Sequence, residues 1–155
     1  MENESIKRIE DYRQSLEQLY SEVRSWVEAE SYNTQEELIE LDEPRAGRYQ
    51  VPKLTIRNSS GKALAELVPV GAWIIGADWR VDVVGHMQNE VLVYWRSGAP
   101  ELDIPEPENG AKRKERLFKG ADKEGWYWIE DKKFGRARPV DKELLLDLIS
   151  EVQPL

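Results

Sequence analysis

The chain has 155 residues, close to the commonest domain size, and its 40% apolar residues suffice for a hydrophobic core. It carries 22 Lys and Arg against 30 Asp and Glu, a formal net charge of −8, and has no cysteine, which excludes disulfides, zinc knuckles, iron–sulfur clusters and thiol nucleophiles. No run approaches the roughly 18 apolar residues of a membrane span, and the first residues lack the apolar stretch of a signal peptide. We therefore expect a single cytoplasmic domain over 1–155 with no membrane partner.

Charge is distributed unevenly along the chain. Residues 1–45 carry 5 basic and 13 acidic side chains, whereas residues 112–142 carry 11 basic and 6 acidic ones. Such an asymmetry bears on association and on orientation toward a partner rather than on the fold. We expect an acidic N-terminal region and a basic patch late in the chain.

Residues 1–30 are predicted to form one long helix. Six apolar residues recur at steps of three and four and make a stripe along one side: Ile9, Tyr12, Leu16, Leu19, Val23 and Trp26. Ser5 is the expected N-cap. The stripe is expected to dock on the protein's own sheet, because three heptads are too few for a stable isolated coiled coil. A homodimer through this helix is the alternative.

Residues 31–47 are predicted to form a short helix and a loop. Thr34 and Glu37 have the spacing of a capping box, in which each side chain accepts a hydrogen bond from the other residue's backbone. The apolar residues of this helix would be Leu38, Ile39 and Leu41. Pro44 then ends the helix, because the residue before a proline disfavours helical backbone.

From residue 49 the apolar period changes from helical to alternating. Short apolar runs are separated by turns such as Asn-Ser-Ser-Gly at 58–61. Turns of a few residues join antiparallel neighbours, so residues 49–96 are expected to form an antiparallel meander. No helical crossover lies between these strands, which argues against a doubly wound nucleotide-binding fold.

The remaining segments complete the predicted fold. Residues 97–111 are predicted to be a Pro-rich loop, residues 112–140 a basic segment followed by a hairpin, and residues 141–155 a C-terminal helix capped by Asp141. The fold class is therefore α+β, with a long N-terminal helix, an antiparallel β-meander of about six strands and a C-terminal helix.

Residues typical of catalytic sites are few. His86 is the single histidine and lies in a polar turn, so neither a serine triad nor a metal site built on several histidines is expected. Asp78, Asp82 and Glu66 would suit a hydrolase if they shared one sheet face, but a solvated strand face explains them equally well. No glycine-rich phosphate loop is present. We assign no catalytic residue, metal or cofactor, and keep a carboxylate-based hydrolase as the least favoured alternative.

Cations are interleaved with aromatic residues in the segment 112–138. The candidate residues for binding single-stranded nucleic acid are Lys112, Arg113, Lys114, Arg116, Phe118, Lys132, Lys133, Arg136 and Arg138. Charge for phosphates and rings for base stacking are what such a ligand requires. The net charge of −8 opposes the approach of a polyanion, so nucleic-acid binding is an alternative function. Pairing of these cations with the acidic N-terminal helix is the competing explanation.

A partner protein fits the charge distribution better. The acidic residues expected to attract a basic partner are Glu10, Glu17, Glu36, Glu37 and Glu40. Trp79 lies in a predicted turn, where an exposed indole would anchor the partner. The build of this sequence (small, acidic, Cys-free, without catalytic residues) is similar to that of bacterial immunity proteins and other small inhibitors of basic toxins. The resemblance implies a non-catalytic protein-interaction module acting as an inhibitor or adaptor, and this is the function we expect.

Overall fold

The computed structural model describes residues 3–106, 108 and 110–153. Its helices are α1 (Asn3–Glu28) and α2 (Lys142–Glu151). Its strands are β1 (Asn33–Glu43), β2 (Gly47–Arg57), β3 (Ala63–Gly71), β4 (Trp79–Val84), β5 (Asn89–Trp95), β6 (Glu101–Pro105), β7 (Lys112–Arg116), β8 (Gly125–Asp131) and β9 (Arg136–Pro139). The predicted α+β class is confirmed, but the described chain has nine strands where about six were expected. The ends of the predicted terminal helices, at 1–2 and 154–155, and positions 107 and 109 of the predicted loop lie outside the described residues.

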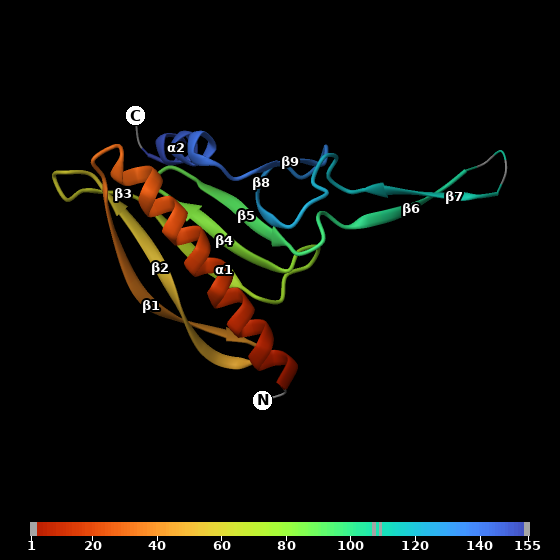
Figure 1. Cartoon of the computed structure of the whole chain (residues 1–155), viewed down its shortest axis with the longest axis horizontal. Coiled ribbons are helices and arrows are strands. Elements are labelled where there is room, and N and C mark those ends of the chain that lie inside the picture. Colours follow the sequence, from red (N-terminus) through yellow and green to blue (C-terminus); the bar gives the residue numbers. More distant parts are fainter. Residues whose placement is uncertain (1–2, 107, 109, 154–155) are drawn as a thin grey trace.

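The strands form two antiparallel sheets. The main sheet has seven strands in the order β1-β2-β3-β4-β5-β8-β9, and β6 and β7 form a separate two-stranded ribbon. Figure 1 shows the ribbon projecting away from the rest of the molecule. Strand order follows chain order apart from the insertion of the ribbon, as the short turns predicted.

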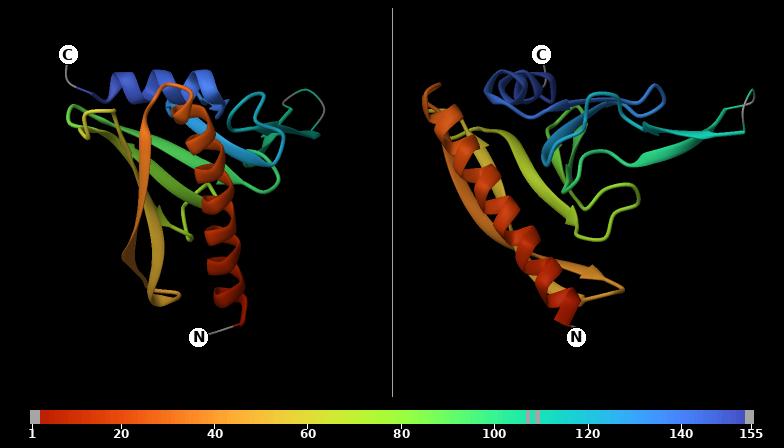
Figure 2. Two further views of the ribbon diagram at one scale, coloured as in Figure 1. Left: turned by 60° about the vertical axis from the view of Figure 1, so that its left-hand side comes forward. Right: turned by 45° about the vertical axis from the view of Figure 1, so that its right-hand side comes forward.

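Helix α1 crosses the curved sheet on one face (Figures 1 and 2). Its residues in the main core are Ile9, Tyr12, Leu16, Leu19, Tyr20, Val23 and Val27, with Trp26 half-buried beside them. Docking of the predicted stripe on the protein's own sheet is therefore confirmed. Within the described residues, neither helix combines the length and apolar character needed to cross a bilayer.

The predicted cap of α1 is wrong. Ser5 lies inside the helix, which begins at Asn3, and its buried hydroxyl donates to the carbonyl of Arg45 at 3.2 Å. Ser5 therefore fastens α1 to the turn between β1 and β2. Asp141 caps α2 as expected, because its carboxylate accepts a hydrogen bond from the backbone N–H of Leu144 at 2.8 Å.

The short helix predicted within 31–47 is also wrong, because this segment contains strand β1 and the turn into β2. All eleven residues of β1 pair with β2, from Asn33 with Arg57 to Glu43 with Gly47. Ile39 and Leu41 alternate with exposed residues and pack against the core. Such tertiary pairing overrides the helical preference of a Glu- and Leu-rich segment.

Strand β2 twists as it passes α1. Tyr49 and Val51 are buried, and so are Leu54 and Ile56, although the two pairs have opposite parity along the strand. β3 pairs with β2 only from Leu54 onward, so the preceding part of the β1–β2 hairpin is a two-stranded ribbon. Two-stranded ribbons twist more strongly than wide sheets, and here the twist turns both faces of β2 in succession toward the core.

The reverse face of β5 and β8 carries a second, smaller core. Its buried residues are Val93, Trp95, Ala99, Phe118, Ala121 and Tyr127. The loop predicted at 97–111 is a loop only in part, since β6 occupies Glu101–Pro105 and pairs with β7. The predicted basic hairpin is confirmed as β8 and β9.

Candidate functional site

Strand β1 forms one border of the main sheet and carries an acidic surface. Its eleven residues include five carboxylates and no cation. Glu36, Glu37 and Glu40 are exposed, and between them Leu38 is 62% exposed. Figures 1 and 2 show β1 at the outside of the sheet. Within the described residues, one flank of β1 therefore has no neighbouring strand, and its outward backbone groups are available for pairing.

The structure brings the acidic residues of α1 to the same side of the molecule. Glu10 and Glu17 are seven residues apart and therefore share one flank of the helix. Arg13 and Arg24 follow the same flank and bind the β1–β2 hairpin: Arg13 donates to the carbonyl of Gln50 at 2.8 Å, and Arg24 pairs with Glu36. This flank of α1 and β1 together form the acidic face.

Most of the ion pairs on the acidic face are long and solvated. Lys53 lies 3.7 Å from Glu37, and Arg48 lies 3.7 Å from Glu40. The carboxylates in these pairs are more than half exposed. Exposed pairs of this kind contribute at most about 1 kcal/mol each, so the carboxylates remain available to a stronger cationic partner.

The prediction that Trp79 is exposed is wrong. Trp79 is 1% exposed and begins β4, where Val81 and Val83 alternate with it on the buried face. Its ring stacks on Tyr94 at 5.2 Å and lies under the guanidinium of Arg96 at 4.6 Å. Trp79 therefore lies beneath Arg96 and is not exposed as an anchor for a partner.

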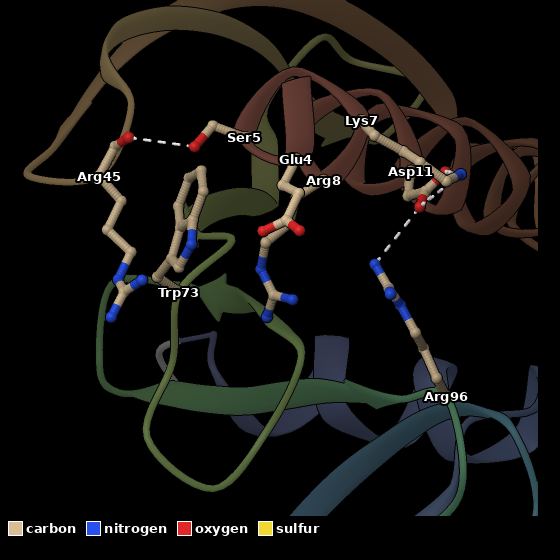
Figure 3. A pocket seen from close by; sticks show the side chains of 8 residues that line it. All are labelled: Glu4, Ser5, Lys7, Arg8, Asp11, Arg45, Trp73 and Arg96. Carbon is tan, nitrogen blue, oxygen red and sulfur yellow. Dashed lines mark hydrogen bonds and ion pairs between the residues drawn. The ribbon is translucent and has the colours of Figure 1, made fainter. Parts of the chain in front are cut away.

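A cavity of about 560 Å³ opens beside the first turns of α1 (Figure 3). It is lined by Glu4, Ser5, Lys7, Arg8, Asp11, Arg45, Trp73 and Arg96. Four of these side chains are cationic and two are anionic, the opposite balance to the whole chain. The lining residues lie on α1, in the β1–β2 turn, in the segment before β4 and at the end of β5. We call this the cationic pocket.

Arg8 is the most firmly held cation of the pocket. Its side chain donates to the carbonyls of Ala72 and Asp78, the latter at 2.8 Å. The guanidinium also lies 5.8 Å from the ring centroid of Trp73 and 5.7 Å from that of Trp79. Partial burial lowers the pKa of Arg8; Asp78 opposes the shift, and the positive charge of Arg96 adds to it. Arg8 is thus a fixed cation in the positive electrostatic field of neighbouring cations such as Arg96.

The carboxylates behind the pocket are engaged by the backbone. Glu43 accepts hydrogen bonds from the N–H groups of Ala72 at 3.1 Å and Trp73 at 3.2 Å, and from the hydroxyl of Tyr49. Asp78 accepts from the N–H of Arg96 at 2.7 Å. These contacts hold the segment 72–78 in place and thereby position Trp73 at the wall.

Arg45 differs from the other arginines of the pocket. It lies in the turn between β1 and β2, and its guanidinium makes no hydrogen bond or ion pair within the described part of the chain. Figure 3 shows the side chains of Arg45 and Arg8 extending in the same direction, with Trp73 between them in this view. Arg96, by contrast, lies 3.4 Å from the carboxylate of Asp11.

The predicted nucleic-acid patch is not one continuous surface. Four cations lie on β7, next to the acidic strand β6: Asp103 is paired in register with Lys114, and Glu101 with Arg116. Arg116 further donates to the carbonyls of Ser97 at 3.0 Å and Ala99 at 2.7 Å, at the base of the ribbon. The predicted pairing of these cations with the N-terminal helix is wrong for Arg113 and Arg116, which pair within or beside the ribbon.

The rest of that patch lies near the β8–β9 turn. Phe118 is 5% exposed and belongs to the smaller core, so it is not available for base stacking. Phe134 is 70% exposed, with Lys133 and Arg136 over its ring at 5.6 and 5.9 Å. Lys132 and Arg138 are exposed nearby, and Arg136 also pairs with Asp131 at 3.2 Å.

The carboxylates considered for catalysis are held apart by separate partners. Asp82 binds Arg80 at 2.7 Å, Glu66 binds Lys53 at 2.7 Å, and Asp78 is engaged by Arg96. Within the ranges that the structure describes, no three His, Asp or Glu residues gather as a metal site would require. His86 is exposed in the turn before β5, as predicted.

Sequence reasoning missed the cationic pocket. Arg8, Arg45, Trp73 and Arg96 come from four segments, and none belongs to a recognisable motif. The one available signal was that Arg8 interrupts an acidic segment. No family model, curated protein or solved structure matches this chain.

Proposed function

We propose that this protein is a non-catalytic protein-interaction module, and that its acidic face binds an extended basic segment of a partner protein, as an inhibitor or adaptor would. The observation that carries the proposal is the border strand β1, with five carboxylates, no cation and an exposed Leu38. A strand without a neighbour on one side offers a row of backbone donors and acceptors to a second chain.

The negative charge of β1 determines which strands can pair with it. Carboxylates along β1 repel acidic strands and discourage pairing between copies of the protein, a usual protection of sheet borders. A strand rich in Lys or Arg exchanges the long pairs with Arg48 and Lys53 for closer ones and adds backbone hydrogen bonds. The exposed side chain of Leu38 supplies an apolar contact in the middle of the acidic row.

The test compares two variants of equal net charge. In the first, Glu36, Glu37 and Glu40 are changed to Gln; in the control, Glu143 and Glu151 are changed to Gln and Asp147 to Asn, all exposed on α2. Both variants remove three negative charges, so a difference between them reports position and not total charge. Each is used, with the unaltered protein, to capture partners from native extract with and without nuclease treatment.

We expect one stoichiometric protein partner, with a basic binding segment, to be captured by the unaltered protein and the control but not by the β1 variant. Equal capture by both variants would contradict a role for β1. Loss of all binding after nuclease treatment would instead favour the nucleic-acid alternative, which the near balance of charge between β6 and β7 does not support.

A further inference from the structure

We propose that the cationic pocket is a second binding site, separate from the acidic face, and that it takes a small organic phosphate whose flat ring packs against Trp73. The site is formed by Arg8, Arg45, Arg96 and Trp73 around a cavity of about 560 Å³. This volume lies within the range of about 300–1,000 Å³ that is typical of small-molecule sites.

Arg8 and Arg45 have N–H donors that make no hydrogen bond among the described contacts. A guanidinium has five N–H donors, and the described contacts of Arg8 use two of them, on Ala72 and Asp78. Arg45 uses none within the described residues. Guanidinium groups match the oxygens of phosphate with paired hydrogen bonds, so this wall suits an oxyanion better than a neutral ligand.

Arg8 and Arg96 are held in place before any anion binds. Arg8 is held by two backbone carbonyls and by the rings of Trp73 and Trp79, so little side-chain freedom is lost when it binds an anion. Arg96 is held by the ring of Trp79 and by the carboxylate of Asp11 at 3.4 Å. A phosphate near these two cations and Arg45 would relieve their mutual repulsion. A doubly charged group is the better match, because the four cations and two carboxylates that line the cavity leave a net charge of +2.

The indole of Trp73 offers a surface on which a flat ring of the ligand can stack. Trp73 is half-buried and lines the cavity, and its backbone N–H is held by Glu43. Aromatic side chains bind flat ring systems by stacking, as they do with bases. A nucleoside monophosphate combines both features, a doubly charged phosphate and a flat ring, and is the ligand class we propose.

The carboxylates of the pocket provide a discriminating variant. Asp11 binds Arg96 and Lys7, whereas Glu4 has no hydrogen bond or ion pair within the described chain. A free carboxylate at the cavity opposes a phosphate by like-charge repulsion. Glu4→Gln should therefore strengthen phosphate binding, an effect that loss of structure would not produce.

The test is calorimetric titration of the full chain with adenosine 5′-monophosphate, and separately with adenosine and with inorganic phosphate. The variants are Arg45→Gln, Glu4→Gln and the control Arg48→Gln, which removes an exposed arginine from the same hairpin outside the pocket. The guanidinium of Arg45 makes no hydrogen bond or ion pair within the described residues, so its replacement should leave the fold intact, and unchanged melting curves verify this for each variant.

We expect one molecule of the nucleotide per chain. Arg45→Gln should weaken binding about tenfold, the loss of a charge-assisted hydrogen bond, and Arg48→Gln should change it less than about twofold. Adenosine alone and phosphate alone should bind more weakly than the nucleotide. Equal affinities of the Arg45 and Arg48 variants, or no binding at millimolar nucleotide, would overturn the proposal. Phosphate binding as tight as the nucleotide would overturn the role of Trp73.

The two proposals fail independently. The variant with Gln at positions 36, 37 and 40 leaves every residue of the cationic pocket unchanged and should bind the nucleotide as the unaltered protein does. Arg45→Gln should likewise leave partner capture intact. If both variants lost both activities, the sites would not be separate and the further proposal would be wrong.

Discussion

The β1–β2 and β6–β7 hairpins use the same local structure in opposite ways. The β1–β2 hairpin twists around α1 and places four buried residues of β2 in the main core: Tyr49, Val51, Leu54 and Ile56. No residue of β6 or β7 is buried, and the ribbon projects from the molecule (Figure 1). Because an isolated two-stranded ribbon is marginal in water, the comparison shows that burial, not strand pairing, makes a hairpin part of the fold.

The two hairpins also differ in how their charged residues are arranged. In β6–β7 the two carboxylates of β6 lie opposite cations of β7, Glu101 opposite Arg116 and Asp103 opposite Lys114, so the ribbon carries little net charge. In β1–β2 the carboxylates gather on the outer strand, while the cations Arg48 and Lys53 lie on the inner one. Both hairpins are strongly charged in sequence, but the charges nearly cancel in β6–β7 and form an acidic border in β1–β2.

The largest test of this comparison is a matched pair of truncations. Leu54→Ala in β2 removes a fully buried side chain and should lower the free energy of unfolding by about 2–5 kcal/mol. Ile104→Ala in β6 removes a half-buried one and should cost less than about 0.5 kcal/mol. Urea denaturation of both variants measures the difference. Similar losses would mean that the ribbon is integrated into the cooperative unit.

Alkaline pH provides a second test, because burial and then the hydrogen bond to Glu43 raise the pKa of Tyr49 well above its ordinary value of 10. Above pH 10 the unfolded chain releases this proton while the folded chain retains it, so stability falls as pH rises. Tyr12 and Tyr20, whose pKa values are also raised by burial, act in the same direction. Tyr49→Phe should reduce the fall by up to about 1.4 kcal/mol per pH unit, the limit approached as the unfolded tyrosine becomes fully ionised, measured by denaturation between pH 10 and 11.5. An unchanged slope would show that Tyr49 titrates normally.

At the ribbon, the base is expected to matter more for stability than the hairpin itself. Arg116→Gln removes hydrogen bonds to Ser97 and Ala99 and should cost about 1–3 kcal/mol, because two carbonyls at the base lose a charged donor. Replacing 102–115 by a short Gly-Ser turn, with Arg116 retained, should change stability by less than about 1 kcal/mol. Thermal melting of both proteins tests whether one side chain at the base matters more than the whole ribbon.

Helices and central strands could be predicted because their signals are local. The stripe from Ile9 to Val23 and the cap at Asp141 use contacts within or next to one element. Strand β1 was missed because charged residues lie on both of its faces, as borders of sheets allow, and only pairing with β2 reveals it. The alternation of Trp79 with Val81 and Val83 could have placed the indole inside, but the preceding turn residues outweighed it.

The binding surfaces were predicted less well, for a physical reason. The acidic residues of α1 and β1 meet because the chain reverses between them, which the charge count anticipated without giving the geometry. The cationic pocket depends on Arg8, Arg45 and Arg96 meeting after the whole sheet has formed. Such long-range convergence leaves no local period in the sequence.

The agreement of strand order with chain order has a consequence for how quickly the protein folds. β1 to β5 each pair with the next strand, so these contacts require only short loops to close, and such topologies fold comparatively fast. The exception is the pairing of Trp95 with Gly125, which must close residues 96–124. Removing 102–115 roughly halves that loop and lowers the entropy of closure by about 0.6 kcal/mol. If β5 and β8 meet in the rate-limiting step, the protein without its ribbon should fold up to about threefold faster than the intact chain.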